Sequence, residues 1–136
     1  FYKWIDFMVG KFKLKKQEPT ENQVLDAVGR YLELKQIFFF RVNNAPTYQS
    51  DGRGGGFWRK QSKYSVNGVP DLIAISKEGK FVGLEIKRPS GVQSEEQKKF
   101  EYNVRRNGGE YYLIKSVDDL VNILWYEEEK QQDAQK

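Results

Sequence analysis

The chain has 136 residues, a formal net charge of +4, no cysteine and no histidine. Without thiols it can form neither disulfides nor a cysteine-ligated zinc site, and without imidazole it lacks a Ser-His-Asp triad and a histidine proton switch. Any acid or base chemistry therefore falls to carboxylates, Lys, Tyr or metal-bound water. The length suits one domain, and 38% hydrophobic against 31% charged residues is typical of a folded chain.

The sequence contains no run of 18 apolar residues, so we expect neither a membrane-spanning segment nor a membrane partner. Its N-terminal apolar residues precede their basic cluster, which is the reverse of a secretory signal. We therefore expect an intracellular, cytoplasmic protein. Because the first residue is Phe1 and not Met, we also expect the encoded protein to begin upstream.

The first predicted element is a helix. Thr20 and Gln23 have the spacing of a capping box, and the helix should run to about Lys35. Leu25, Val28 and Leu32 form its apolar stripe, and Glu21 lies on that same stripe. Glu21 either points toward a site or is simply a first-turn acid favoured by the helix dipole.

The middle of the chain is predicted as strands. Residues 37–42, 71–76 and 80–87 are rich in β-branched and aromatic residues, and a turn at 77–79 joins the last two into a hairpin. In the third strand, alternation places Glu85 and Lys87 on one face and Val82, Leu84 and Ile86 on the other.

A basic, glycine-rich loop over residues 43–69 separates the first two strands, and a basic, aromatic arm over residues 1–17 precedes the first helix. Basic residues in and beside the loop are Arg41, Arg53, Arg59, Lys60 and Lys63. Such residues interleaved with aromatic ones are typical of a surface that follows a nucleic-acid backbone and stacks on bases. A solvated surface, or a hairpin extension whose aromatic residues pack down, explains the same pattern.

The remaining elements complete the order α-β-β-β-α-β-α. Ser94 and Gln97 form a second capping box for a helix to about Asn107, with Gln97, Phe100 and Val104 on one stripe. A strand follows over residues 110–115. In a last helix after Ser116, an apolar face is formed by Leu120, Val121, Leu124 and Trp125, and a charged tail covers residues 127–136. We therefore expect an α/β domain over residues 18–126 with a mixed central sheet flanked by helices.

Three charged residues converge in this arrangement: Asp71 at the start of one strand, and Glu85 and Lys87 on its neighbour. Two nearby carboxylates repel unless a cation lies between them, and Mg²⁺ prefers oxygen ligands. The backbone carbonyl of Ile86 would add a third ligand. Such a site favours phosphodiester hydrolysis, in which Lys87 would orient or deprotonate a water or hold the phosphate. An ordinary cross-strand salt bridge is the alternative.

At this point the sequence resembles a known family. The segments Gly68-Val69-Pro70-Asp71-Leu72 and Gly83-Leu84-Glu85-Ile86-Lys87 resemble the PD-(D/E)XK nuclease signature. The early helix glutamate, the S-x-x-Q helix start and the later Gly-Gly before a Tyr-rich strand are similar to its VRR-NUC branch, over residues 18–122. The resemblance implies a restriction-endonuclease-like αβββαβ core.

The resemblance also implies roles for individual residues. Asp71 and Glu85 would bind Mg²⁺ or Mn²⁺, with the Ile86 carbonyl beside them. Lys87 would be the catalytic lysine, Glu21 a third acidic group acting on the metal, through water, or on the water itself, and Gln97 a residue that orients the site. A capping role alone would also explain Gln97.

Stand-alone viral and bacterial members of this branch look like homodimers that cut branched DNA such as Holliday junctions or flaps. We therefore expect a DNA endonuclease with no small-molecule cofactor, and a homodimer formed through the N-terminal arm and the last helix, unless these are an ordinary domain edge. The alternatives are a nucleic-acid-binding module that does not cut and a sequence-specific restriction-like endonuclease.

Overall fold

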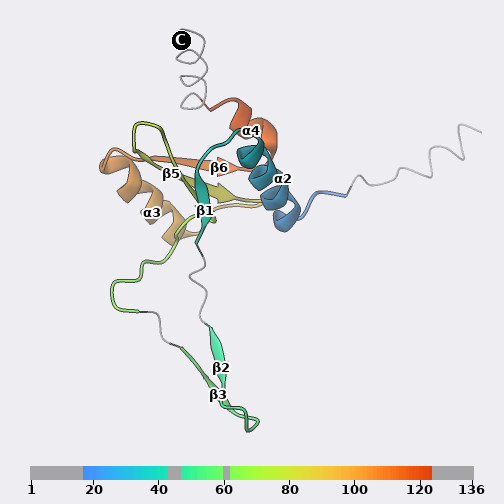
Figure 1. The fold of residues 1–136 in the computed structure, drawn as a ribbon, viewed down its shortest axis with the longest axis vertical. Coiled ribbons are helices and arrows are strands. Elements are labelled where there is room, and N and C mark those ends of the chain that lie inside the picture. Colours follow the sequence, from blue (N-terminus) through green and yellow to red (C-terminus); the bar gives the residue numbers. More distant parts are fainter. Residues whose placement is uncertain (1–16, 43–46, 60–61, 124–136) are drawn as a thin grey trace, which may run out of the picture.

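The computed structural model describes residues 17–42, 47–59 and 62–123 (Figure 1). The predicted charged tail lies outside this part of the chain, as do all but the last residue of the predicted N-terminal arm, together with Lys60, Leu124 and Trp125. Among the described residues, no helix is both long enough and apolar enough to cross a membrane.

Helix α2, Glu21–Leu34, begins where the sequence predicts. The Thr20 hydroxyl accepts the Gln23 N–H at 3.3 Å, and the Gln23 side chain accepts the Thr20 N–H at 2.9 Å, which completes the capping box. The predicted apolar stripe needs one correction. Val24, Val28 and Leu32 are the buried residues, whereas Leu25 only packs against the edge of the core.

The central sheet has the strand order β1-β4-β5-β6. Its strands are β1 (Phe39–Arg41), β4 (Leu72–Ile75), β5 (Phe81–Ile86) and β6 (Glu110–Ile114). Strand β4 is antiparallel to both of its neighbours, β1 and β5, and β5 pairs in parallel with β6. Helix α3, Glu95–Arg106, provides the crossover between these two parallel strands. The predicted mixed sheet flanked by helices is confirmed.

Strand β5 lies inside the sheet, and both of its faces are covered. Val82, Leu84 and Ile86 join the core beneath α2 and the short helix α4, Val117–Val121. The opposite face looks toward α3, where Phe81 packs against Phe100 with ring centroids 6.3 Å apart. Glu85 lies on this second face, so the predicted alternation is correct, but its carboxylate is buried instead of solvated.

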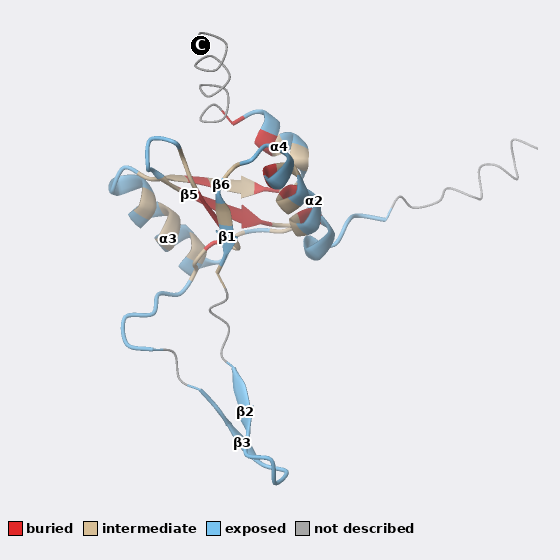
Figure 2. Ribbon diagram, viewed as in Figure 1, coloured by how far each residue is buried: buried red, intermediate tan, exposed pale blue. Residues whose placement is uncertain are grey.

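Residues 43–69 were predicted as a long loop with a hairpin as the alternative, and the described part contains a hairpin. Strands β2 (Tyr48–Ser50) and β3 (Gly56–Trp58) pair antiparallel. The aromatic residues of this hairpin do not pack against the rest of the described protein, as the alternative required, because every residue of both strands is exposed (Figure 2). On the predicted apolar face of helix α4, Leu120 is buried and Val121 is 46% exposed.

Candidate active site

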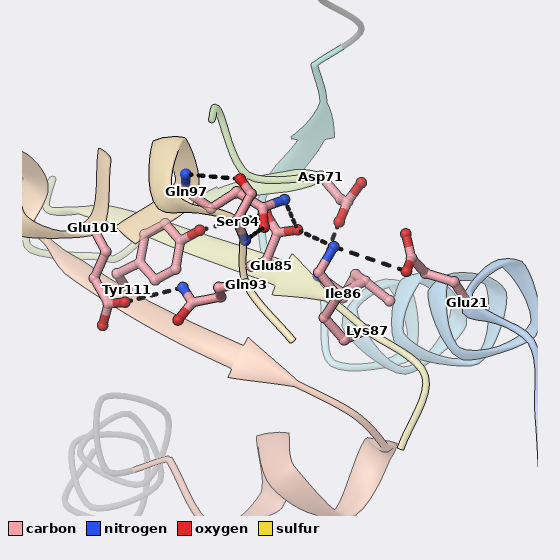
Figure 3. A network of polar contacts seen from close by, with 10 residues as sticks. All are labelled: Glu21, Asp71, Glu85, Ile86, Lys87, Gln93, Ser94, Gln97, Glu101 and Tyr111. Carbon is pink, nitrogen blue, oxygen red and sulfur yellow. Dashed lines mark hydrogen bonds and ion pairs between the residues drawn. The ribbon is translucent and has the colours of Figure 1, made fainter. Parts of the chain in front are cut away.

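The predicted charged residues meet where β4 begins and β5 ends (Figure 3). Asp71 directly precedes β4, and the register that pairs Leu72 with Leu84 brings it next to the last residues of β5. One Asp71 carboxylate oxygen accepts the Ile86 N–H at 2.9 Å. Because the N–H and C=O of a strand residue point to the same side, the Ile86 carbonyl is directed toward Asp71 as well.

Glu85 is the centre of the contacts. The residue is only 1% exposed, and both carboxylate oxygens have protein partners. Oε1 accepts a 2.5 Å hydrogen bond from Gln97 Nε2 and lies 3.1 Å from Lys87 Nζ. The hydroxyl of Tyr111, a fully buried residue on β6, donates to Oε2 at 3.4 Å. A buried carboxylate would otherwise be costly, and these three donors offset that cost.

The environment of Glu85 moves its titration toward neutral pH. Burial, reinforced by the negative charge of Asp71, raises the pKa of Glu85 from 4.5 to about 7, although Lys87 and Tyr111 act in the opposite direction. Burial lowers the pKa of Lys87, but the carboxylates of Glu85, Glu21 and Asp71 outweigh this effect, and the pKa is raised overall. Lys87 is therefore a charged ammonium at neutral pH, held beside a carboxylate that titrates there.

Glu21 reaches the same cluster from the first turn of α2. Its carboxylate lies 3.9 Å from Lys87 Nζ, and its side chain is 48% exposed. The structure thus brings Glu21 to the ammonium of Lys87, which lies between it and the carboxylate of Glu85. A groove of about 680 Å³ opens beside Glu21, and its lining includes Arg88, the residue that follows Lys87. The exposed end of the cluster therefore faces a space that carries a basic side chain.

Gln97 serves both of the purposes that the sequence left open. Its carbonyl oxygen accepts the Ser94 N–H at 2.8 Å, which closes the capping box of α3. Its amide nitrogen donates to Glu85 at the same time. Capping therefore orients the amide that contacts the buried carboxylate.

Tyr111 was not singled out by sequence reasoning, although its strand was noted as Tyr-rich. It pairs with Gly83 across β5 and β6, and a side chain at Gly83 would come within 2.9 Å of the Tyr111 ring. The missing side chain therefore makes room for the ring that approaches Glu85. Arg105 of α3 donates to the Tyr111 carbonyl at 2.6 Å, and this hydrogen bond connects the helix to β6. The same guanidinium forms an ion pair at 3.0 Å with Glu101, one turn earlier in α3.

The predicted nucleic-acid-binding residues do not all come together. Arg41 lies opposite Leu72, one residue from Asp71, and lines a groove between α2 and β1. Arg53 and Arg59 belong to the β2–β3 hairpin, and Lys63 follows it. Among the members of this set that the structure describes, only Arg41 is thus close along the sheet to the acidic residues.

The residues at the site fit a divalent cation of the Mg²⁺ type. Two carboxylates, Asp71 and Glu85, and the Ile86 carbonyl form a hard oxygen donor set. Within residues 17–42, 47–59 and 62–123 no group of three or more carboxylates is arranged to hold a metal ion. Mg²⁺ does not require one, because it keeps several waters and often binds through one or two carboxylates and a substrate phosphate.

Comparison with known proteins adds no assignment: no family model, curated protein or solved structure matches the chain. The interpretation of the site therefore depends on its geometry and chemistry.

Proposed function

We propose that this chain is a Mg²⁺- or Mn²⁺-dependent endonuclease of the PD-(D/E)XK type, close to the VRR-NUC branch, that hydrolyses DNA phosphodiester bonds. The observation that carries the proposal is the buried Glu85 carboxylate, which lies with Asp71 at one end of the neighbouring strands β4 and β5 and holds the Lys87 ammonium at 3.1 Å. A surface salt bridge would not require burial, a neighbouring carboxylate and three donors on one glutamate.

Asp71, Glu85 and the Ile86 carbonyl would hold the divalent cation. When bound, such a cation lowers the pKa of its water and offsets negative charge on the phosphate. Glu85 and Asp71 together carry more negative charge than Lys87 alone neutralises, which is the electrostatic demand that a cation would meet.

Lys87 would act as a charged donor. Its raised pKa disfavours removal of a proton from water, so of the three roles considered for this residue, orienting the water or holding the attacked phosphate fits the site better. Glu21 lies on the solvent side of the ammonium and would accept from it or from a water bound there. Gln97 would keep one Glu85 oxygen in place through its amide.

Cleavage assays test this proposal most directly. Labelled four-way junctions, flaps, single strands and linear duplexes are incubated with the protein and Mg²⁺ or Mn²⁺. We expect wild-type protein to cut branched DNA, and Lys87→Met and Glu85→Gln to lose about a hundredfold or more in rate while binding DNA normally in EDTA. Lys80→Met is the matched control, because the Lys80 side chain forms an ion pair with the exposed Glu78 at the far end of the same β-hairpin.

Normal cleavage by the Lys87 or Glu85 variant would contradict the proposed site. Binding of every substrate with no cleavage would indicate a non-cleaving nucleic-acid-binding module. Cutting of linear duplex at one sequence would indicate a restriction-like enzyme. Light scattering tests the homodimer that a junction substrate implies. Most of the interface expected for that dimer lies outside the described part of the chain, namely residues 1–16 of the N-terminal arm and Leu124 and Trp125 of the last helix.

A further inference from the structure

Aromatic side chains lie on both faces of the β2–β3 hairpin. Tyr48 pairs directly with Trp58, so both side chains lie on one face, and Phe57 opposite Gln49 lies on the other. Tyr48 is 50% exposed, Phe57 59% and Trp58 66%. Large aromatic residues exposed on a two-stranded ribbon are unusual, because such a ribbon gains its stability by packing against something else.

One face of the hairpin is built as an aromatic platform. The Tyr48 and Trp58 rings meet edge to face with centroids 5.4 Å apart. Gly56 makes this possible, because a side chain there would come within 2.6 Å of the Tyr48 ring. The Tyr48 ring therefore lies across the glycine backbone, and half or more of each side chain of the pair is exposed. Figure 2 shows that the strands of the hairpin are exposed along their whole length.

The tip of the hairpin is ordered by its own hydrogen bonds. One Asp51 carboxylate oxygen accepts the N–H groups of Arg53 at 2.8 Å and Gly55 at 3.0 Å. Since the only acidic side chain of the hairpin is used by its own backbone, the charges left facing outward are those of Arg53 and Arg59. The hairpin thus combines exposed aromatic surface with an excess of positive charge, two arginines against one aspartate.

We propose that the β2–β3 hairpin is a stacking arm for unpaired DNA bases, with Trp58 and Tyr48 as the stacking surface and Arg53 and Arg59 as backbone contacts. Stacking is sequence-tolerant because every base has a π face, and arginines beside the rings hold the phosphates. Bases inside a continuous duplex cannot reach such a surface. The inference deepens the proposed function by naming DNA with unpaired bases, at a fork, flap or open junction, as the preferred substrate, and it rests on that function for its choice of DNA.

Equilibrium binding in EDTA tests the arm separately from cleavage. Fluorescence anisotropy is recorded with labelled oligothymidylate and with a blunt duplex of equal length. We expect Trp58→Ala to weaken binding of the single strand by roughly five- to a hundredfold and binding of the duplex by less than about twofold. Tyr102→Ala is the matched control, because Tyr102 is similarly exposed at 65% but lies on α3. It should change neither affinity.

Equal losses on single strand and duplex, or no difference between the Trp58 and Tyr102 variants, would overturn the stacking arm. A change in oligomeric state on Trp58→Ala without a change in affinity would also overturn it, since the hairpin would then bind a second copy of the chain. Trp58→Phe should restore most of the single-strand affinity if stacking is responsible. Because no metal is present, loss of the proposed cleavage would leave this result unaffected, and the reverse also holds.

Discussion

The buried carboxylate of Glu85 makes a prediction about stability that needs no substrate. The unfolded chain should have the ordinary pKa of 4.5 at this position, whereas the folded protein has a pKa of about 7. At about 1.4 kcal/mol for each factor of ten, ionisation of Glu85 should cost the folded state about 3 kcal/mol. This is a large share of the 5 to 15 kcal/mol that stabilises most domains.

The sign of the effect follows from the raised pKa. The free energy of unfolding is not reduced by Glu85 below pH 4.5, where the side chain is neutral in both the folded and the unfolded state. Stability is then lost as the pH rises from 4.5 through 7. Glu85→Gln imitates the neutral form and still accepts from Gln97 and Lys87. The free energy of unfolding of the wild type should therefore fall by about 2 to 3 kcal/mol between pH 5 and pH 8 relative to that of the variant.

Urea unfolding followed by circular dichroism in EDTA provides the measurement, with the two proteins compared at each pH so that other titrating groups cancel. Glu78→Gln, an exposed glutamate on the turn between β4 and β5, is the control and should follow the wild type at every pH. Parallel curves for wild type and Glu85→Gln would refute the claim that burial and Asp71 raise this pKa.

Two further predictions concern residues around the carboxylate. Gly68→Ala should destabilise the protein by roughly 2 to 4 kcal/mol in urea unfolding, because φ is +77° and the new methyl would meet the backbone of the first turn of α3 at 2.3 Å. Gly79→Ala has a similar φ of +79° with open space around it, and should lose only about 1 kcal/mol; equal losses would contradict the close approach. Tyr111→Phe removes a donor that lowers the pKa of Glu85, so the acid limb of the cleavage rate profile should move to higher pH. Tyr112→Phe, whose hydroxyl bonds Glu110 at 2.7 Å, should leave that profile unchanged.

Much of the fold follows from local signals in the sequence. Capping boxes at Thr20 and Ser94 place both long helices correctly, and the turn at residues 77–79 joins β4 and β5 as expected. The period of two in β5 also predicts which side chains share a face with Glu85. These features depend on residues a few positions apart, where geometry alone determines the outcome.

Features that depend on distant residues were not predictable in the same way. The contact between Tyr111 and Glu85 depends on which residues of the parallel strands β5 and β6 lie side by side. A hydrophobic pattern predicts the face on which each residue lies, but it does not name the partner residue on a strand far along the chain. At residues 43–69 the sequence allowed either an irregular loop or a hairpin whose aromatic residues pack against a core, whereas the described part forms the hairpin without such packing. The exposure of these aromatic residues became visible only in three dimensions.

The amide of Gln97 links helix initiation to the chemistry of the site through a single functional group. Glutamate is the commoner partner in a capping box and would cap α3 as well, yet it would place a second negative charge against Glu85 in place of a donor. Gln97→Glu would therefore leave the helix start intact and still disturb the buried carboxylate. At position 97, capping of α3 permits either glutamine or glutamate, whereas the contact with Glu85 permits only glutamine. Gln97→Glu therefore separates the constraint that folding imposes from the constraint that the site imposes.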